Sequence, residues 1–182
     1  MKKRIREYIL KKACKQEIRS RSVSNLYDAK TIGILFDATS KDDFGKVKKL
    51  LNSLTEKGLK IFIIGFVNSK EVPDVYLIRK GFNFFCRKDL NWYGKPVVPF
   101  VDEFIKKEFD ILINLDLNNT YPLHYIECLS KAHFKAGRMF PGNEDHDIMI
   151  DINLEPTLDF LISQIIHYLA EINKKEPSHS YY

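Results

Sequence analysis

From residue 31 to residue 173, short apolar runs alternate with amphipathic helical segments, and this alternation strongly constrains the fold. The runs are rich in β-branched and aromatic residues and have the length of strands, which indicates buried strands. We expect strands at 31–36, 60–67, 83–86, 109–115 and 147–152, and a further short strand at 135–139. We expect helices at 41–57, 99–107, 122–132 and 156–173.

Strands that alternate with helices in this way form parallel βαβ crossovers. Such crossovers are right-handed, which places helices on both faces of the sheet. The sequence therefore predicts an α/β fold, a Rossmann-like sandwich with a mostly parallel sheet of five or six strands. We assign it to residues 31–173, after an N-terminal arm (1–24) and before a polar tail (174–182).

The positive charge of the chain is concentrated in the arm. Residues 1–23 carry nine Lys and Arg and two Glu, whereas the rest of the chain carries 20 basic and 22 acidic side chains. The arm has no Gly or Pro, which predicts a helix over 2–22. Ile5, Ile9 and Ala13, with Leu10 and Cys14 to one side, share its broad apolar face. Its candidate polyanion-binding residues are Lys2, Lys3, Arg4, Lys11, Lys12, Lys15 and Arg19.

A basic arm on a nearly neutral body favours contact with a polyanion, either a nucleic acid or an anionic membrane surface. The apolar face is modest for lipid binding, because it carries neither Trp nor Phe. Alternatively, this face packs on the body and the cations are simply solvated.

Polar residues follow the predicted strands at the edge where open α/β sheets bind ligands. The candidate ligand-binding residues there are Asp37, Ser40, Asp116 and Asn118. Asp37 and Asp116 could hold a divalent ion or orient a sugar hydroxyl, or each could bond nearby backbone amides at the start of its loop. The loop after the first strand has no glycine-rich phosphate motif and carries three acids, so we expect no dinucleotide, no ATP hydrolysis and no other cofactor.

The segment 87–96 (RKDLNWYGKP) is the least generic stretch of the chain. Its candidate polyanion-binding residues are Arg87, Lys88, Trp92 and Lys95. Aromatic side chains interleaved with cations can stack on bases or sugars. Alternatively, Trp92 plugs the end of the sheet and would be inaccessible to solvent.

The cysteines and histidines predict no metal or catalytic site. Cys14, Cys86 and Cys128 form no C-x-x-C pair, which favours reduced thiols in a cytoplasmic protein. The histidines form neither H-x-x-x-H nor H-E-x-x-H, and 144–147 resembles a solvated acidic loop more than a metal site. With no secretory signal and no apolar run long enough to span a bilayer, we expect a cytoplasmic location.

The blocks FNFFCRKDLNWYGKP (82–96) and FDILINLDLNNTYPLHYIECLSKAHFKAGR (109–138) resemble an uncharacterised bacterial family, a domain of unknown function found mainly in Bacteroidetes. A second, weaker similarity rests on Phe109-Asp110, Ser130-Lys131-Ala132 and Lys135-Ala136-Gly137. These residues are similar to the N-terminal halves of heptosyltransferase-like glycosyltransferases. This similarity implies a Rossmann-like fold but no activity, since those enzymes bind the nucleotide-sugar largely through a second domain.

These observations favour a non-catalytic α/β binding module whose basic arm docks on RNA or a ribonucleoprotein. Two alternatives stay open. One is a peripheral membrane-surface protein. The other is an enzyme that binds a sugar or nucleotide in the strand-end crevice, using Asp37 and Asp116.

Overall fold

The computed structural model describes residues 2–16, 18–142 and 145–173, so the tail predicted at 174–182 lies outside the described part. The strands are β1 (Thr31–Asp37), β2 (Lys60–Val67), β3 (Phe82–Cys86), β4 (Ile111–Asn114), β5 (Phe134–Arg138) and β6 (Ile148–Ile150). The α-helices are α1 (Lys2–Gln16), α2 (Lys41–Glu56), α3 (Asp74–Leu77), α4 (Pro99–Lys106), α5 (Tyr121–Leu129) and α6 (Leu158–Glu171). A short 3₁₀ helix, η1 (Arg87–Asp89), follows β3.

These strands form one sheet in the order β3-β2-β1-β4-β5-β6, and every neighbouring pair is parallel. This is the strand order of doubly wound α/β folds, which confirms the predicted fold class. The order reverses between β1 and β4, the place where such sheets open a crevice at the carboxyl ends of their strands.

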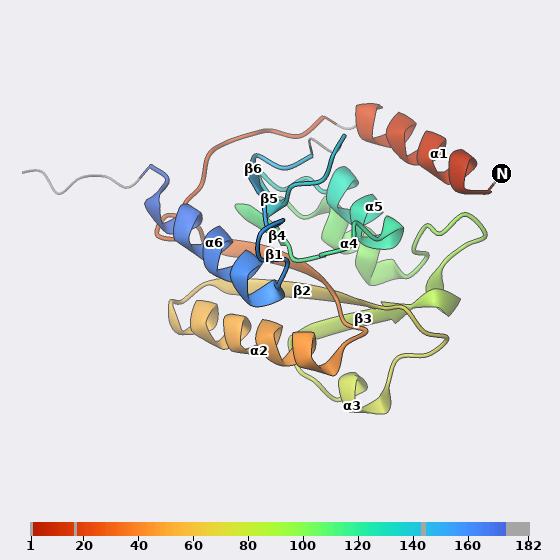
Figure 1. The fold of residues 1–182 in the computed structure, drawn as a ribbon, viewed down its shortest axis with the longest axis horizontal. Coiled ribbons are helices and arrows are strands. Elements are labelled where there is room, and N and C mark those ends of the chain that lie inside the picture. Colours follow the sequence, from red (N-terminus) through yellow and green to blue (C-terminus); the bar gives the residue numbers. More distant parts are fainter. Residues whose placement is uncertain (1, 17, 143–144, 174–182) are drawn as a thin grey trace, which may run out of the picture.

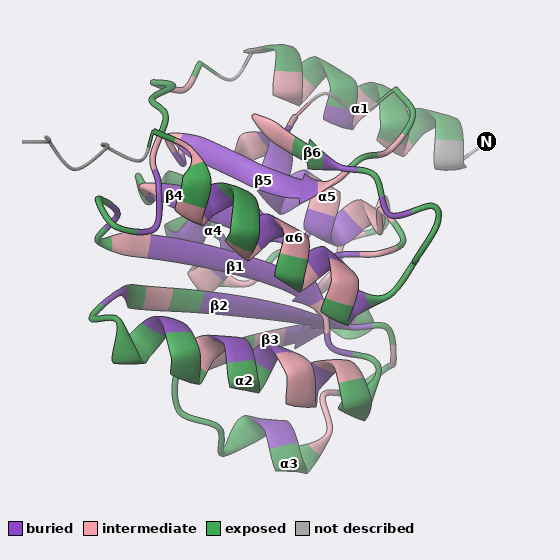
Figure 2. Ribbon diagram, turned by 60° about the vertical axis from the view of Figure 1, so that its left-hand side comes forward, coloured by how far each residue is buried: buried purple, intermediate pink, exposed green. Residues whose placement is uncertain are grey.

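Helices cover both faces of the sheet (Figure 1). On one face, α2 and α6 enclose a core that includes Ile32 and Ile34 of β1. On the other face, α4 and α5 enclose a second core that includes Leu35. Successive residues of a strand point to opposite faces, so β1 contributes to both cores and is buried along most of its length (Figure 2).

The predicted arm helix is too long. It ends at Gln16 rather than near residue 22, and residues 18–30 continue as an irregular segment towards β1. This segment is bonded to the residue before β5 and to α6, since Ser22 N donates to His133 O at 3.2 Å and Leu26 N donates to Leu169 O at 2.9 Å. These tertiary bonds compete with helix propensity and fix a different backbone course.

Among the described helices, none is both long and apolar enough to cross a bilayer.

A pair of glycines tests the packing of the sheet. A Cβ on Gly33 of β1 would lie 2.9 Å from Phe104 Cζ and 2.9 Å from Phe109 Cδ2, whereas a Cβ on Gly45 of α2 would meet nothing within 4 Å. We expect Gly33→Ala to destabilise the fold by about 1–3 kcal/mol through overpacking. The matched control Gly45→Ala should stabilise it by about 0.5–1 kcal/mol. Urea unfolding measures both, and a neutral Gly33→Ala would contradict this packing.

Candidate functional site

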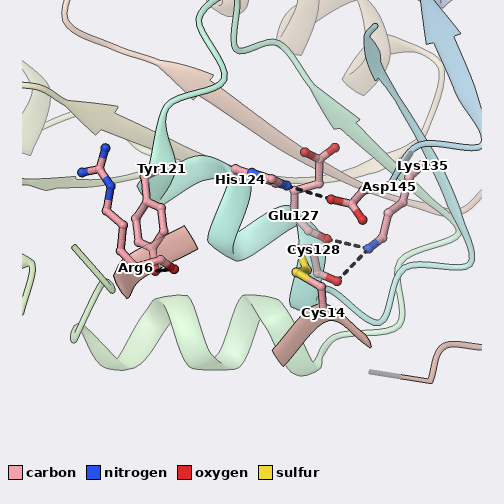
Figure 3. Close-up of a disulfide and its surroundings, with 8 residues drawn as sticks. All are labelled: Arg6, Cys14, Tyr121, His124, Glu127, Cys128, Lys135 and Asp145. Carbon is pink, nitrogen blue, oxygen red and sulfur yellow. Dashed lines mark hydrogen bonds and ion pairs between the residues drawn. A yellow bond between two sulfur atoms is a disulfide. The ribbon is translucent and has the colours of Figure 1, made fainter. Parts of the chain in front are cut away.

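The arm helix α1 lies along α5, and the contacts advance in the same direction on both helices (Figure 3). Near the start of α5, the Tyr121 hydroxyl donates to the Arg6 carbonyl at 3.2 Å. The Arg6 guanidinium lies 5.1 Å from the centroid of the Tyr121 ring. Leu10 is buried between the helices, and Cys14 then forms a disulfide with Cys128, with Cα atoms 5.6 Å apart. The arm is therefore fixed on the body.

This disulfide corrects one expectation. The three cysteines are not all reduced thiols, because Cys14 and Cys128 are joined and Cys86 alone is free and buried. The face of α1 that meets the body is one side of the predicted apolar face. It is centred on Leu10 and Cys14, whereas Ile5 stays 39% exposed.

A fully buried acid lies beneath the disulfide, on the inner side of α5. Glu127 accepts a hydrogen bond from Asn114 Nδ2 at 2.8 Å and forms an ion pair with the ring of His146. Burial acts to raise the pKa of Glu127, but His146, the nearby His124 and the hydrogen bond from Asn114 together hold that pKa below its ordinary value. The His146 ring rests on Gly137 of β5, where any Cβ would collide with it.

The predicted solvated acidic loop is instead packed against the body where it is described, at residues 145–147. Asp145 Oδ2 lies 2.8 Å from His124 Nε2 of α5. Asp147 accepts two hydrogen bonds from Arg19, at 2.7 and 2.8 Å, and His146 is buried between them. His146 thus lies against α5, the helix that carries His124, although the spacing of the two histidines in the sequence matches no motif.

Two further cations are held inside the body near the disulfide. Lys135 of β5 donates to the carbonyls of Glu127 and Cys128, and burial lowers the pKa of Lys135 to about 8. Arg19 also donates to the carbonyls of Ala132 and His133, and its side chain is 7% exposed. Unlike other predicted cations of the arm, Arg19 is committed to the body.

The other predicted cations of the arm point outward where they are described. The exposed ones are Arg4, Lys11, Lys12 and Lys15. Within the described part of the chain, no carboxylate forms an ion pair with any of them. The side chains of Lys2 and Lys3 lie outside the described residues.

The strand-end candidates make mostly local bonds. Asp37 Oδ1 accepts from Thr39 N at 2.9 Å, and the Ser40 hydroxyl caps α2. Asp116 is buried, which raises its pKa, and it accepts from Asn118 N at 2.9 Å and from the Thr120 hydroxyl at 2.8 Å. Both aspartates therefore bond backbone amides, as the alternative interpretation expected, while the Asn118 side chain stays exposed.

The loop after β3, which we call the loop 87–97 because it contains the predicted segment 87–96 and Val97, packs against α5. Trp92 is 66% exposed, so the alternative in which it plugs the sheet is wrong. Lys95 Nζ lies 5.7 Å from the centroid of the Tyr125 ring. Gly94 has φ +96°, and a Cβ there would lie 3.0 Å from the Tyr121 ring. Arg87 and Lys88 are exposed on η1.

A cavity of about 660 Å³ opens between α1 and the body. Its polar lining includes Arg6, Lys11 and Lys15 from α1, and Asn118, Asn119 and His124 from the body. It lies beyond the carboxyl end of β4, because Asn118 and Asn119 of its lining belong to residues 115–120, which join β4 to α5.

The only group of three possible metal ligands among the described residues is Cys14, Cys128 and Asp145, whose ligand atoms lie within 4.8 Å of one another. Thiolates bind metals, whereas the two sulfur atoms here are joined to each other. In the disulfide form this group therefore offers no thiolate to a metal.

Sequence reasoning missed Glu127, His146 and Gly137. Glu127 lies between Ile126 and Cys128 in a mostly apolar helix, and an acid in such a run is a signal of a buried partner. Gly137 in a strand signals close approach of another group. Nothing local to His146 could identify it as that group.

The disulfide closes a long loop, since its cysteines are 114 positions apart. In the chain-entropy account, such a bond stabilises the fold by about 4–5 kcal/mol. We expect a thiol reductant to lower the urea midpoint of the native chain but not that of the Cys14→Ser/Cys128→Ser double variant. Equal midpoints for the native chain with and without reductant would contradict the disulfide.

His124 predicts a pH dependence of stability. Burial acts to lower the pKa of His124, but the hydrogen bond with Asp145 and the charge of Glu127 raise it overall. The folded state then binds the proton more tightly than the unfolded state. The resulting stability is fully present below the unfolded pKa of about 6.5 and is lost as pH rises through the folded pKa.

We therefore expect the free energy of unfolding to fall as the pH rises from about 6 to about 7, before Lys135, with its pKa of about 8, loses much of its proton in the folded state. Urea unfolding at constant ionic strength measures it. His124→Gln should flatten this slope, and an unchanged slope in that variant would assign the dependence to another group.

The comparisons with known proteins come down to one match. A family model described as a family of unknown function, DUF6913, matches residues 2–172, from α1 through the end of α6. No curated protein and no solved structure matches the chain. The match covers arm and body together, in agreement with the resemblance to a domain of unknown function. The chain belongs to this family of unknown function, DUF6913.

Proposed function

We propose that this protein is a non-catalytic module that binds RNA or a ribonucleoprotein through a surface made by α1 and the loop 87–97. One observation carries the proposal. Tyr121 holds the Arg6 guanidinium over its ring and also lies against Gly94. The two segments that the sequence marked separately as polyanion-binding therefore meet on the same helix, α5.

The chemistry of this surface suits RNA. Exposed cations on α1 can contact phosphates, and they flank Tyr8, which is 70% exposed. From Arg4 to Lys15 the helix rises about 16 Å, so the cations are spread along a strand rather than gathered at a point. Tyr8 and Trp92 offer aromatic rings for stacking on bases, which adds about 1–3 kcal/mol per base.

Docking of the arm also favours a rigid partner over a membrane. A helix that lies on a bilayer inserts its apolar face, but Leu10 and Cys14 of α1 are turned against α5. Because α1 is already held in place, little ordering is needed when a partner binds. The enzyme alternative is less favoured, since Asp37 and Asp116 are engaged in local hydrogen bonds.

The proposal includes a cytoplasmic location, where structured RNA is abundant, and a bacterial source as the family resemblance implies. The disulfide weighs against the cytoplasm, because disulfides persist mainly in oxidising compartments. Alkylation of thiols in intact cells checks this part: a cytoplasmic protein should carry mostly free Cys14 and Cys128. In that form the Leu10 cluster and the Arg6–Tyr121 contacts hold α1 on α5. The similarity to heptosyltransferase-like enzymes adds only the fold.

The test compares two variants of equal charge. In the first, Arg4, Lys11, Lys12 and Lys15 of α1 are all changed to Gln. In the matched control, the exposed Lys41, Lys48, Lys49 and Lys57 on and beside α2 are changed to Gln. Binding to a labelled RNA stem–loop is followed by anisotropy over a salt series, and Trp92, the one Trp of the chain, reports directly by its fluorescence.

We expect the α1 variant to bind more weakly and its log–log salt slope to be smaller by about 3, since each lost phosphate contact removes about 0.7–0.9. The control should keep at least most of the native slope, and RNA should change the Trp92 emission. If both variants lose the same RNA affinity, the interaction depends only on net charge and the proposed surface is contradicted. If the chain binds anionic vesicles but not RNA, the membrane alternative is favoured.

A further inference from the structure

We infer that the cavity between α1 and the body binds a ribonucleoside monophosphate, either free or as the phosphorylated end of an RNA. If the ligand is a free nucleotide, the inference is independent of the proposed function. If the ligand is an RNA end, the inference rests on the proposed function. The volume of about 660 Å³ is in the range of sites for small organic ligands and far exceeds that of a phosphate ion.

The charges around the cavity favour a phosphate. Arg6, Lys11 and Lys15 line it from α1, and Glu7 is the acid that α1 adds. The remaining acid of the lining, Asp145, is paired with His124 at 2.8 Å. The cations are therefore in excess, and an incoming phosphate can form charge-assisted hydrogen bonds with them.

The opposite wall offers fixed polar groups. Asn118 and Asn119 line the cavity, and Asn119 has φ +50°, a left-handed conformation that is uncommon for residues other than glycine. The buried Asp116 holds this loop, since it accepts hydrogen bonds from Asn118 N and from Thr120. Two side-chain amides are thus presented on a preformed loop, and amides bond sugar hydroxyls and base edges.

Arg6 provides a surface for the base. Its guanidinium is held over the Tyr121 ring, and its Nε is buried without a hydrogen-bond partner among the described residues. Bases stack on guanidinium planes in single-stranded RNA recognition. The position of the cavity agrees with this ligand class, because open α/β sheets bind ligands beyond the carboxyl ends of their strands.

A monophosphate fits better than a triphosphate. The chain has no glycine loop that could wrap a β- and γ-phosphate with backbone amides. The cations of the cavity come instead from side chains of one helix, at Arg6, Lys11 and Lys15, which suits a single phosphate group.

The experiment is isothermal titration calorimetry of the full disulfide-bonded chain with AMP, CMP, GMP and UMP, and with adenosine and inorganic phosphate. We expect at least one monophosphate to bind, and adenosine and phosphate each to bind at least tenfold more weakly. Asn118→Asp adds a negative charge to the exposed wall and should weaken binding at least tenfold, with an unchanged circular dichroism spectrum. Lys48→Gln/Lys49→Gln on α2 is the control, since both residues are exposed and neither lines the cavity, and it should bind like the native chain.

Absence of binding by all four monophosphates, or native affinity in Asn118→Asp, would overturn the inference. If the chain binds RNA but no nucleotide, only this inference is overturned. If it binds a nucleotide but no RNA, only the proposed function is overturned. A stem–loop with a terminal phosphate, compared with the same stem–loop ending in a hydroxyl, separates the two sources. If the phosphorylated form binds more tightly and this difference is lost in Asn118→Asp, the ligand is the RNA end. If both forms bind equally, the ligand is the free nucleotide.

Discussion

The covalent bond between Cys14 and Cys128 is the interaction on which the rest of this site depends. It joins α1 to α5 across 114 positions of sequence, while the other contacts between the two helices are a small apolar cluster around Leu10 and the pairing of Arg6 with Tyr121. Without a fixed α1, the cavity would lose one wall, and Arg6 would lose its place over Tyr121, the residue against which Gly94 of the loop 87–97 also lies. The disulfide therefore makes the basic helix α1 part of a surface with a fixed shape.

The buried network beneath α5 has a different role. Glu127, Asn114 and His146 bring the segment after β5 onto α5, and Asp147 with Arg19 holds the end of the arm to the same segment. Burying such charges is costly, and removing one partner would leave the others uncompensated. We interpret the network as positioning: it fixes both the floor under the arm and the loop that carries Asp145.

Much of the body could be predicted from the sequence, because local patterns reflect burial in a sheet. The runs at 31–36 and 60–67 are apolar because β1 and β2 lie between two layers of helices. The helix predicted from residue 41 agrees with the start of α2, whose N-cap is Ser40. The arm was harder, since its contacts are set by partners more than 100 positions away. Within the predicted apolar face, the disulfide fixes the side with Leu10 and Cys14 against the body and leaves Ile5 exposed. Gly137, which has no Cβ, leaves room for the His146 ring.

The central claim is that α1 and the loop 87–97 form one RNA-binding surface around Tyr121. The most direct measurement is photo-crosslinking of RNA to the full chain, with the attachment sites mapped by mass spectrometry. The account predicts crosslinks at both Tyr8 and Trp92, the exposed aromatic residues of the two segments. Crosslinks confined to the α2 and α3 side of the molecule, or to one of the two segments alone, would contradict it.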